Sequence, residues 1–180
     1  PTGYILKPQT DEYAALPEME YLVMKMAEVS GIKTVPHALL RLPSQENAFV
    51  YITKRIDRAD GQMLAMEDFC QLDGRLTEDK YRGSYERCGK VISTYASNKA
   101  LALSQMFLRI AFSFAVGNSD MHLKNFSLRE TEQGNRQFSL SKAYDLLPVN
   151  IILPTDEDQF ALTLNGKKRN IRKKDFLILR

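Results

Sequence analysis

The sequence has few cysteines and no long hydrophobic run. Its 180 residues include two cysteines, Cys70 and Cys88, which are too few for a disulfide framework and too far apart for a metal knuckle. We therefore expect reduced thiols in a cytoplasmic protein, since disulfides persist mainly in oxidising compartments. No apolar stretch approaches the roughly 20 residues of a membrane span, and no signal-peptide pattern is visible. We expect no membrane partner.

Charge and chain length set further limits. The net charge of +3 argues only weakly for a nucleic-acid partner. With 44% hydrophobic residues, the chain can bury one substantial core. It begins at Pro1 without Met, and residues 176–180 are typical of an opening helix. We therefore expect a fragment that is truncated at both ends.

The first third of the chain is predicted to hold three strands and one helix. The helix begins at Pro17, because proline suits a first helical turn, and it ends near Gly31. A turn is expected over residues 43–47, and these elements would form a small α+β lobe over residues 1–57. The expected strands cover residues 4–8, 38–42 and 48–56.

Residues 58–180 are predicted to form a larger, mainly helical lobe. The segment 101–116 is apolar on nearly all sides, which is typical of a buried helix. Short strands on both sides of residues 130–135 predict a hairpin. A polar turn is expected at residues 57–61. The other expected helices cover residues 67–72 and 85–96.

The loop from Gly117 to Asn125 carries the clearest chemical pattern. Asp120 and Asn125 are five residues apart, and Asp145 follows the predicted hairpin. Kinase-type phosphoryl transfer needs one carboxylate to orient a hydroxyl, and an amide oxygen with a second carboxylate to hold Mg²⁺. We predict these roles for Asp120, Asn125 and Asp145. Standing alone, the loop would be better explained as a polar turn with local backbone bonds.

Two neighbours in this loop are assigned supporting roles. Lys124 would neutralise charge on the transferred phosphoryl group, so we count it with Asp120 among the catalytic residues. His122 is placed beside the nucleotide in a structural role, because Asp120 already supplies a base.

Lys7 is predicted to grip phosphates. A kinase uses a strand lysine for this purpose and holds it with a helix carboxylate. Glu20 lies in the first turns of the expected helix and is the preferred partner, with Glu18 and Glu28 as alternatives. Taken alone, Lys7 would be interpreted as a solvated residue of an edge strand.

The connector between the two expected lobes is the predicted adenine site. Backbone groups of Lys54, Arg55 and Ile56 would bond the adenine ring, and Asp57 would receive ribose hydroxyls. The alternative is an ordinary charged end of a strand. Residues 166–174 form a basic segment with six cations. Two explanations stay open for it: a solvated loop, which is favoured, and a contact with phosphates or acidic protein.

Six ordered segments resemble the C-terminal catalytic region of HipA-type serine/threonine kinases, the toxins of bacterial toxin–antitoxin pairs. The match spans nearly all of the chain, and the segment around Asp120 is the most specific. Lys54 and Ile56 depart from the pattern, since relatives often carry an acid and Phe there. The segments are residues 4–8, 16–21, 54–58, 67–71, 117–127 and 143–147.

The resemblance implies a two-lobed, protein-kinase-like α+β fold and an enzyme that uses ATP and Mg²⁺. In this family the counterparts of Asp120, Asn125 and Asp145 are the catalytic and metal-binding residues, and that of Lys7 grips the nucleotide. Members phosphorylate aminoacyl-tRNA synthetases. They bind a helix-turn-helix antitoxin, so contact with DNA would be indirect.

The family also has a phosphate-covering loop and an N-terminal subdomain before the matched region. Both are expected to be missing from residues 1–180 or to lie on a separate polypeptide, so we expect these residues alone to be inactive. Two other functions stay open. The same residues would serve a small-molecule kinase, and an idle regulatory or DNA-tethered module would need none of the chemistry.

Overall fold

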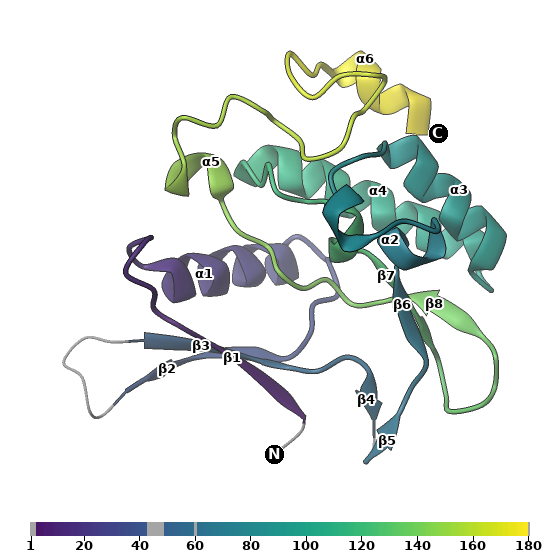
Figure 1. Ribbon diagram of the computed structural model, residues 1–180, viewed down its shortest axis with the longest axis horizontal. Helices are drawn as coiled ribbons and strands as arrows, with labels where there is room; N and C mark the ends of the chain where they lie inside the picture. Colours follow the sequence, from purple (N-terminus) through teal and green to yellow (C-terminus); the bar gives the residue numbers. More distant parts are fainter. Residues whose placement is uncertain (1–2, 43–48, 60, 180) are drawn as a thin grey trace.

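The computed structural model describes residues 3–42, 49–59 and 61–179 (Figure 1). The turn predicted over residues 43–47 lies outside the described residues. Within them, the strands form three separate antiparallel sheets, and the helices gather mainly in the C-terminal two thirds. The fold is therefore mixed α+β, as the sequence predicts.

The first sheet has the strand order β1-β3-β2, from β1 (Tyr4–Pro8), β3 (Phe49–Lys54) and β2 (His37–Arg41). Helix α1 (Leu16–Val29) packs on the central strand β3. Figure 1 shows α1 between this sheet and the helices at the top of the view. The three strands and the helix agree with the prediction.

A small hairpin connects this sheet to the rest of the chain. It pairs β4 (Arg58–Ala59) with β5 (Gln62–Met63), where the sequence predicted only a polar turn. The chain then enters β6 (Met66–Asp68), an edge strand of the sheet β6-β7-β8. Strands β7 (Ser127–Glu130) and β8 (Phe138–Leu140) form the hairpin that the sequence predicted.

The helix predicted over residues 67–72 is wrong at its start. Residues 66–68 pair with β7, and α2 (Phe69–Leu72) begins only at Phe69. The Asp68 side chain accepts a hydrogen bond from the Gln71 backbone N–H at 2.9 Å, which caps the helix there. Residues 67 and 68, whose local pattern also suits a helix, thus pair with β7 as part of a strand.

Helices α3 (Tyr85–Tyr95) and α4 (Lys99–Val116) pack together behind this sheet and begin at the side-chain caps Ser84 and Asn98. The prediction that α4 is buried on nearly all sides is wrong, because Leu101 is 52% exposed and only one face is covered. By length and composition alone α4 would suffice to cross a membrane, but a core helix of a soluble protein meets the same criterion.

The buried core extends from α1 and β3 through the β6-β7-β8 sheet to helices α3 and α4. Phe69 stacks on Phe126, and Tyr85 packs edge-on against both Phe126 and Phe160. Cys70 and Cys88 are buried and free. The remaining helical segments are η1 (Thr77–Asp79), η2 (Leu123–Asn125), α5 (Val149–Ile152), α6 (Lys173–Phe176) and η3 (Leu177–Leu179).

Candidate active site

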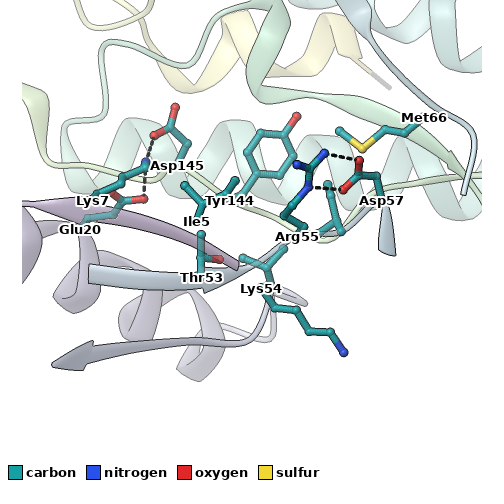
Figure 2. A pocket seen from close by; sticks show the side chains of 12 residues that line it. Ile5, Lys7, Glu20, Thr53, Lys54, Arg55, Asp57, Met66, Tyr144 and Asp145 are labelled. Atoms are coloured by element: carbon teal, nitrogen blue, oxygen red, sulfur yellow. Dashed lines mark hydrogen bonds and ion pairs between the residues drawn. The ribbon is translucent and has the colours of Figure 1, made fainter. Parts of the chain in front are cut away.

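A cavity of about 530 Å³ lies beside the first sheet (Figure 2). Its charged residues are concentrated at two ends, around Lys7 and around Asp57. Apolar side chains line the part between them, which suits a flat hydrophobic ring better than a charged group. The apolar lining comes from Ile5, Val35, Ile56, Met66 and the ring of Tyr144.

Lys7 connects three distant parts of the chain at one end of this cavity. Its ammonium Nζ donates to Glu20 Oε1 at 2.8 Å and to Asp145 Oδ1 at 2.6 Å. Figure 2 shows the three side chains converging. The predicted ion pair between Lys7 and Glu20 is therefore present, and Asp145 shares it. The alternative partner Glu28 instead accepts a hydrogen bond from Thr34 at 3.0 Å, outside the cavity.

The strand register and the helix place this pair. Lys7 lies opposite Tyr51 in the β1–β3 ladder, and its ammonium lies over the fully buried Tyr51 ring. Glu20 is 2% exposed, and this burial raises its pKa to about 7 even though Lys7 opposes the shift. Burial by itself lowers the pKa of the Lys7 ammonium, but Asp145 and Glu20 together raise it above its usual value.

Asn125 and Asp145 meet although they are 20 residues apart. The Asn125 Nδ2 donates to Asp145 Oδ2 at 2.8 Å, and its Oδ1 accepts from the His122 backbone N–H at 2.8 Å. Asp145 has a φ of 59°, in the left-handed region that Asp tolerates better than most residues. The loop after the β6-β7-β8 sheet thus places the Asp145 carboxylate in contact with both Lys7 and Asn125.

Asp120 lies on the loop that follows α4. Gly117, with φ of 69°, ends that helix, and the chain then turns into the loop. The Asp120 Oδ1 accepts a hydrogen bond from the Tyr81 hydroxyl at 2.7 Å. Tyr81 also packs edge-on against His122, with ring centroids 5.1 Å apart. Asp120 does not line the cavity around Lys7.

The other two predicted residues of this loop have structural partners. His122 is 6% exposed, and burial lowers its pKa, so the ring is neutral at pH 7. The Lys124 ammonium forms an ion pair with Asp68 Oδ2 at 3.0 Å rather than with Asp120. This contact ties the loop to the cap of α2.

The predicted connector lies along the other end of the cavity. Lys54, Arg55, Ile56 and Asp57 all line it, although Figure 2 shows the Lys54 side chain leading away. Arg55 donates to both oxygens of Asp57, at 2.9 and 2.7 Å. These hydrogen bonds lower the pKa of the Asp57 carboxyl.

Sequence reasoning missed several residues that line this cavity. Ile5 could have been found from Lys7, because residues two apart on a strand face the same side. Thr53 pairs with Ile5 across the ladder, so the same argument extends to it. Val35, Met66 and Tyr144 had no such local signal. Tyr144 donates through its hydroxyl to the Lys124 carbonyl at 2.9 Å.

The basic segment over residues 166–174 is partly neutralised by internal ion pairs. Lys167 contacts the buried Asp175 at 2.9 Å, and Arg169 contacts Asp158 at 2.6 Å. These contacts favour the structural explanation for those two cations.

The comparisons with known proteins identify the family and the fold. The sequence model of the HipA-like C-terminal domain matches residues 1–178. The chain belongs to this family. It is 32% identical to "Putative kinase Y4dM" of Sinorhizobium fredii over 93% of its length, and 31% identical to "Putative kinase" of Haemophilus influenzae over 82%. It spans 42% and 46% of those two proteins, less than half of each.

Solved structures show the same fold for this HipA-like domain. HipA of Shewanella oneidensis, solved in a complex with HipB and operator DNA, superposes with a TM-score of 0.84 at 19% identity. That match covers 98% of this chain and 45% of HipA. The Helicobacter pylori proinflammatory kinase CtkA gives a TM-score of 0.67 at 16% identity, over 98% and 72%. The kinase-like α+β fold that the sequence predicted is confirmed.

Proposed function

We propose that this HipA-like domain is the catalytic region of an ATP- and Mg²⁺-dependent serine/threonine protein kinase. The observation that carries the proposal is the convergence of Glu20, Lys7, Asp145 and Asn125 at one end of a cavity with an apolar middle. Membership in the family supports a kinase-like function. We also propose the division into lobes at residues 57 and 58.

The cavity suggests how a nucleotide would lie. Ile5, Ile56 and Met66 would pack on the adenine ring, and backbone groups of residues 54–56 would bond its edge. Asp57 would accept from the ribose hydroxyls. Lys7 would then bind the phosphates at the opposite end, held in place by Glu20. In this role Lys7 exchanges its contact with Asp145 for a contact with phosphate oxygen.

The residues near Lys7 fit a magnesium site. The Asp145 carboxylate is half-exposed toward the cavity and offers oxygens of the kind that Mg²⁺ prefers. The Asn125 amide would have to rotate before its Oδ1 could join them, because Oδ1 accepts from the His122 N–H and Nδ2 faces Asp145. The described residues contain no cluster of three or more acidic, His or Cys side chains that could hold a metal. Two protein ligands are sufficient, because Mg²⁺ usually keeps waters and takes phosphate oxygens. Mg²⁺ would neutralise charge on the phosphates.

Asp120 would orient the hydroxyl that receives the phosphoryl group. Its carboxylate already accepts a hydrogen bond from one hydroxyl, that of Tyr81, so it can act as an acceptor in this position. Neutral His122 would support the loop. Lys124 would assist the transfer by leaving Asp68 for the phosphoryl group, a movement that our assignment requires.

The biological setting is likewise a proposal. We place the enzyme in the cytoplasm, with a protein substrate of the aminoacyl-tRNA synthetase type and a helix-turn-helix antitoxin as partner. The complex of HipA with HipB and operator DNA supports the partner. A separate polypeptide carrying the N-terminal subdomain is a further expected partner.

Two substitutions test the proposal in the protein at its natural length. Asp120→Asn should lower phosphate transfer by about 10²- to 10⁴-fold, the range for a lost acid–base group, without weakening Mg-ATP binding. Asp145→Asn should weaken Mg-ATP binding about tenfold or more, since a charged contact contributes ~1.5–3 kcal/mol. Titration calorimetry and ³²P transfer measure the two effects.

Asp11→Asn is the matched control, because Asp11 is exposed and does not line the cavity. Equal Mg-ATP affinity in wild type and Asp145→Asn would remove Asp145 from the metal site. Full transfer by Asp120→Asn would remove Asp120 from the reaction. A variant that kept every cellular effect without transferring phosphate would favour an idle binding module.

A further inference from the structure

A second cavity, of about 520 Å³, adjoins the candidate active site on the side of Asp120. Asp120 lines this cavity, whereas Asp145 lines the first one. The chain passes from one to the other within two residues, since Leu147 belongs to the second lining. Its wall is mainly apolar and is formed by Leu16, Leu147, Val149, Ile152, Leu153 and Phe160.

The Tyr81 hydroxyl shows where a second hydroxyl could lie. It lines the same cavity and donates to Asp120 Oδ1 at 2.7 Å. An acceptor hydroxyl oriented by Asp120 must make a bond of the same kind. The mouth of the apolar cavity is therefore within reach of a group that is bound to Asp120.

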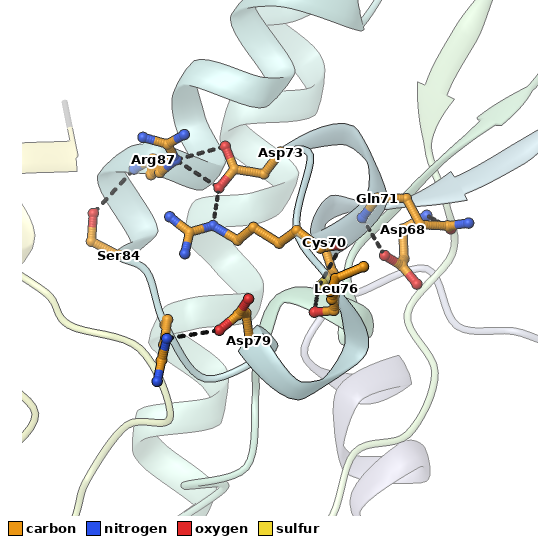
Figure 3. A network of polar contacts seen from close by, with 10 residues as sticks. Asp68, Cys70, Gln71, Asp73, Leu76, Asp79, Ser84 and Arg87 are labelled. Atoms are coloured by element: carbon orange, nitrogen blue, oxygen red, sulfur yellow. Dashed lines mark hydrogen bonds and ion pairs between the residues drawn. The ribbon is translucent and has the colours of Figure 1, made fainter.

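The segment that carries Tyr81 is firmly held. Arg87 Nε donates to both oxygens of Asp73 at 2.6 Å, and Arg82 contacts Asp79 at 3.0 Å. Figure 3 shows Arg87 bonded to Asp73, a contact that links the turn after α2 to the start of α3. These ion pairs lie on both sides of Tyr81 in the chain, and Tyr81 is the residue of this segment that lines the second cavity.

Ser119, Asp156 and Asp158 at the opposite rim already have partners, and Lys168 lines the cavity beside them. Asp156 Oδ2 accepts from the Ser119 hydroxyl at 2.7 Å, and Asp158 Oδ1 accepts from Arg169 at 2.6 Å. A sugar would need several unused polar partners, because unpaired hydroxyls are costly to bury. Three carboxylates of the lining, Asp120, Asp156 and Asp158, outnumber Lys168, which also disfavours an anionic lipid surface.

We propose that this cavity receives an apolar side chain that neighbours the phosphoacceptor serine or threonine of a polypeptide substrate. Leu, Ile, Met and Val are the residues that its wall fits. The inference rests on the proposed kinase function, since it takes Asp120 as the group that orients the acceptor hydroxyl. The specificity would lie in the wall formed by α5 and Phe160.

A position-scanning library of peptides with one fixed serine tests this inference, using the protein at its natural length with Mg-[³²P]ATP. Wild type should prefer peptides with an apolar residue at one or two fixed positions beside the serine. Ile152→Asp should raise KM for a preferred peptide at least tenfold, with the affinity for Mg-ATP unchanged. Ile152→Ala should raise it about threefold, which guards against misfolding of the Asp variant.

Ile151→Asp is the matched control, because Ile151 lies in the same helix, is 64% exposed and does not line the cavity. It should leave KM within twofold of wild type. Equal use of all peptides, equal effects of the two Asp variants, or transfer to a free sugar or to lipid vesicles instead of peptides would overturn the inference. A wild type that does not bind Mg-ATP would overturn the proposed function, and the inference with it.

Discussion

At the scale of single residues, the site depends on a few charged groups that are partly removed from water. Among them, Glu20 has a clearly raised pKa, because burial raises it more than Lys7 lowers it. Lys7 lies between Glu20 and Asp145, so each carboxylate is balanced by the same ammonium. In the proposed function, this shared cation exchanges one carboxylate for a phosphate.

The raised pKa of Glu20 predicts a pH dependence of stability. Between pH 4.5 and about 7 the folded protein holds a proton on Glu20 that the unfolded chain has lost. This contribution to the free energy of unfolding is therefore present below pH 4.5 and is lost as the pH rises through about 7. Glu20→Gln should reduce this fall in the free energy of unfolding with rising pH. Urea unfolding at pH 5, 6 and 7 measures it.

Glu28→Gln is the control in the same helix. The pKa of Glu28 is lowered, chiefly by its bond to Lys25, so its contribution changes below pH 4.5 and stays flat in this window. Identical slopes for wild type and Glu20→Gln between pH 5 and 7 would contradict the assignment of the titration to Glu20.

At the scale of elements, one glycine joins the end of α4 to the rim of the second cavity. Gly117 ends α4, and its carbonyl accepts a hydrogen bond from the Asn150 backbone N–H at 2.9 Å. The Asn150 side chain in turn donates to the carbonyls of Asp156 and Asp158 at the rim of the second cavity. The helix end, the Asp120 loop and the rim therefore form one connected unit.

Gly117→Ala should destabilise the protein and slow the reaction. The new Cβ would lie 3.3 Å from the Asn150 side chain, and the left-handed φ of 69° adds about 1 kcal/mol for a residue with a Cβ. Gly134→Ala is the matched control, since its φ is 75° and no atom lies within 4 Å of its Cβ. Chemical denaturation should show the larger loss at Gly117. Equal losses, with unchanged phosphate transfer, would show that the Asn150 contact has no effect.

At the scale of the whole molecule, the first cavity is lined by residues from position 5 to position 145. A ligand bound there contacts β1, α1, the connector and the loop after β8 at once. Binding should therefore oppose the separation of these parts as well as the unfolding of each. The two backbone bonds between Val35 and Ala143 and between Ala143 and Lys33, at 3.0 and 2.8 Å, already join the same regions.

Mg-ATP should accordingly raise the melting temperature. At a concentration of 100 Kd a ligand adds about 2.7 kcal/mol to the free energy of unfolding, which corresponds to several degrees for a protein of this size. Differential scanning fluorimetry with ATP and Mg²⁺, against ATP with EDTA, measures it. The same rise with EDTA would argue that Mg²⁺ takes no part in binding.

Much of the candidate site could be predicted because its residues carry local signals. Asp120 and Asn125 lie five residues apart in one loop, and Gly117 indicates the end of α4. The start of α2 was harder to predict from the sequence, because residues 66–68 pair with β7, which lies about 60 residues further along the chain. Val35 and Met66 also escaped prediction, because nothing local places them at a cavity.

The sequence by itself determined the family and the kinase-like class of the fold, and it supplied the side chains that we propose for phosphate and metal binding, since these depend on residue types and short spacings. Only the tertiary structure decided which charges meet. It joined Lys7 to Asp145 across 138 residues, paired Lys124 with Asp68, and separated Asp120 from the first cavity. The physical reason is that packing of sheets and helices, rather than local preference, sets distances between residues far apart in the chain.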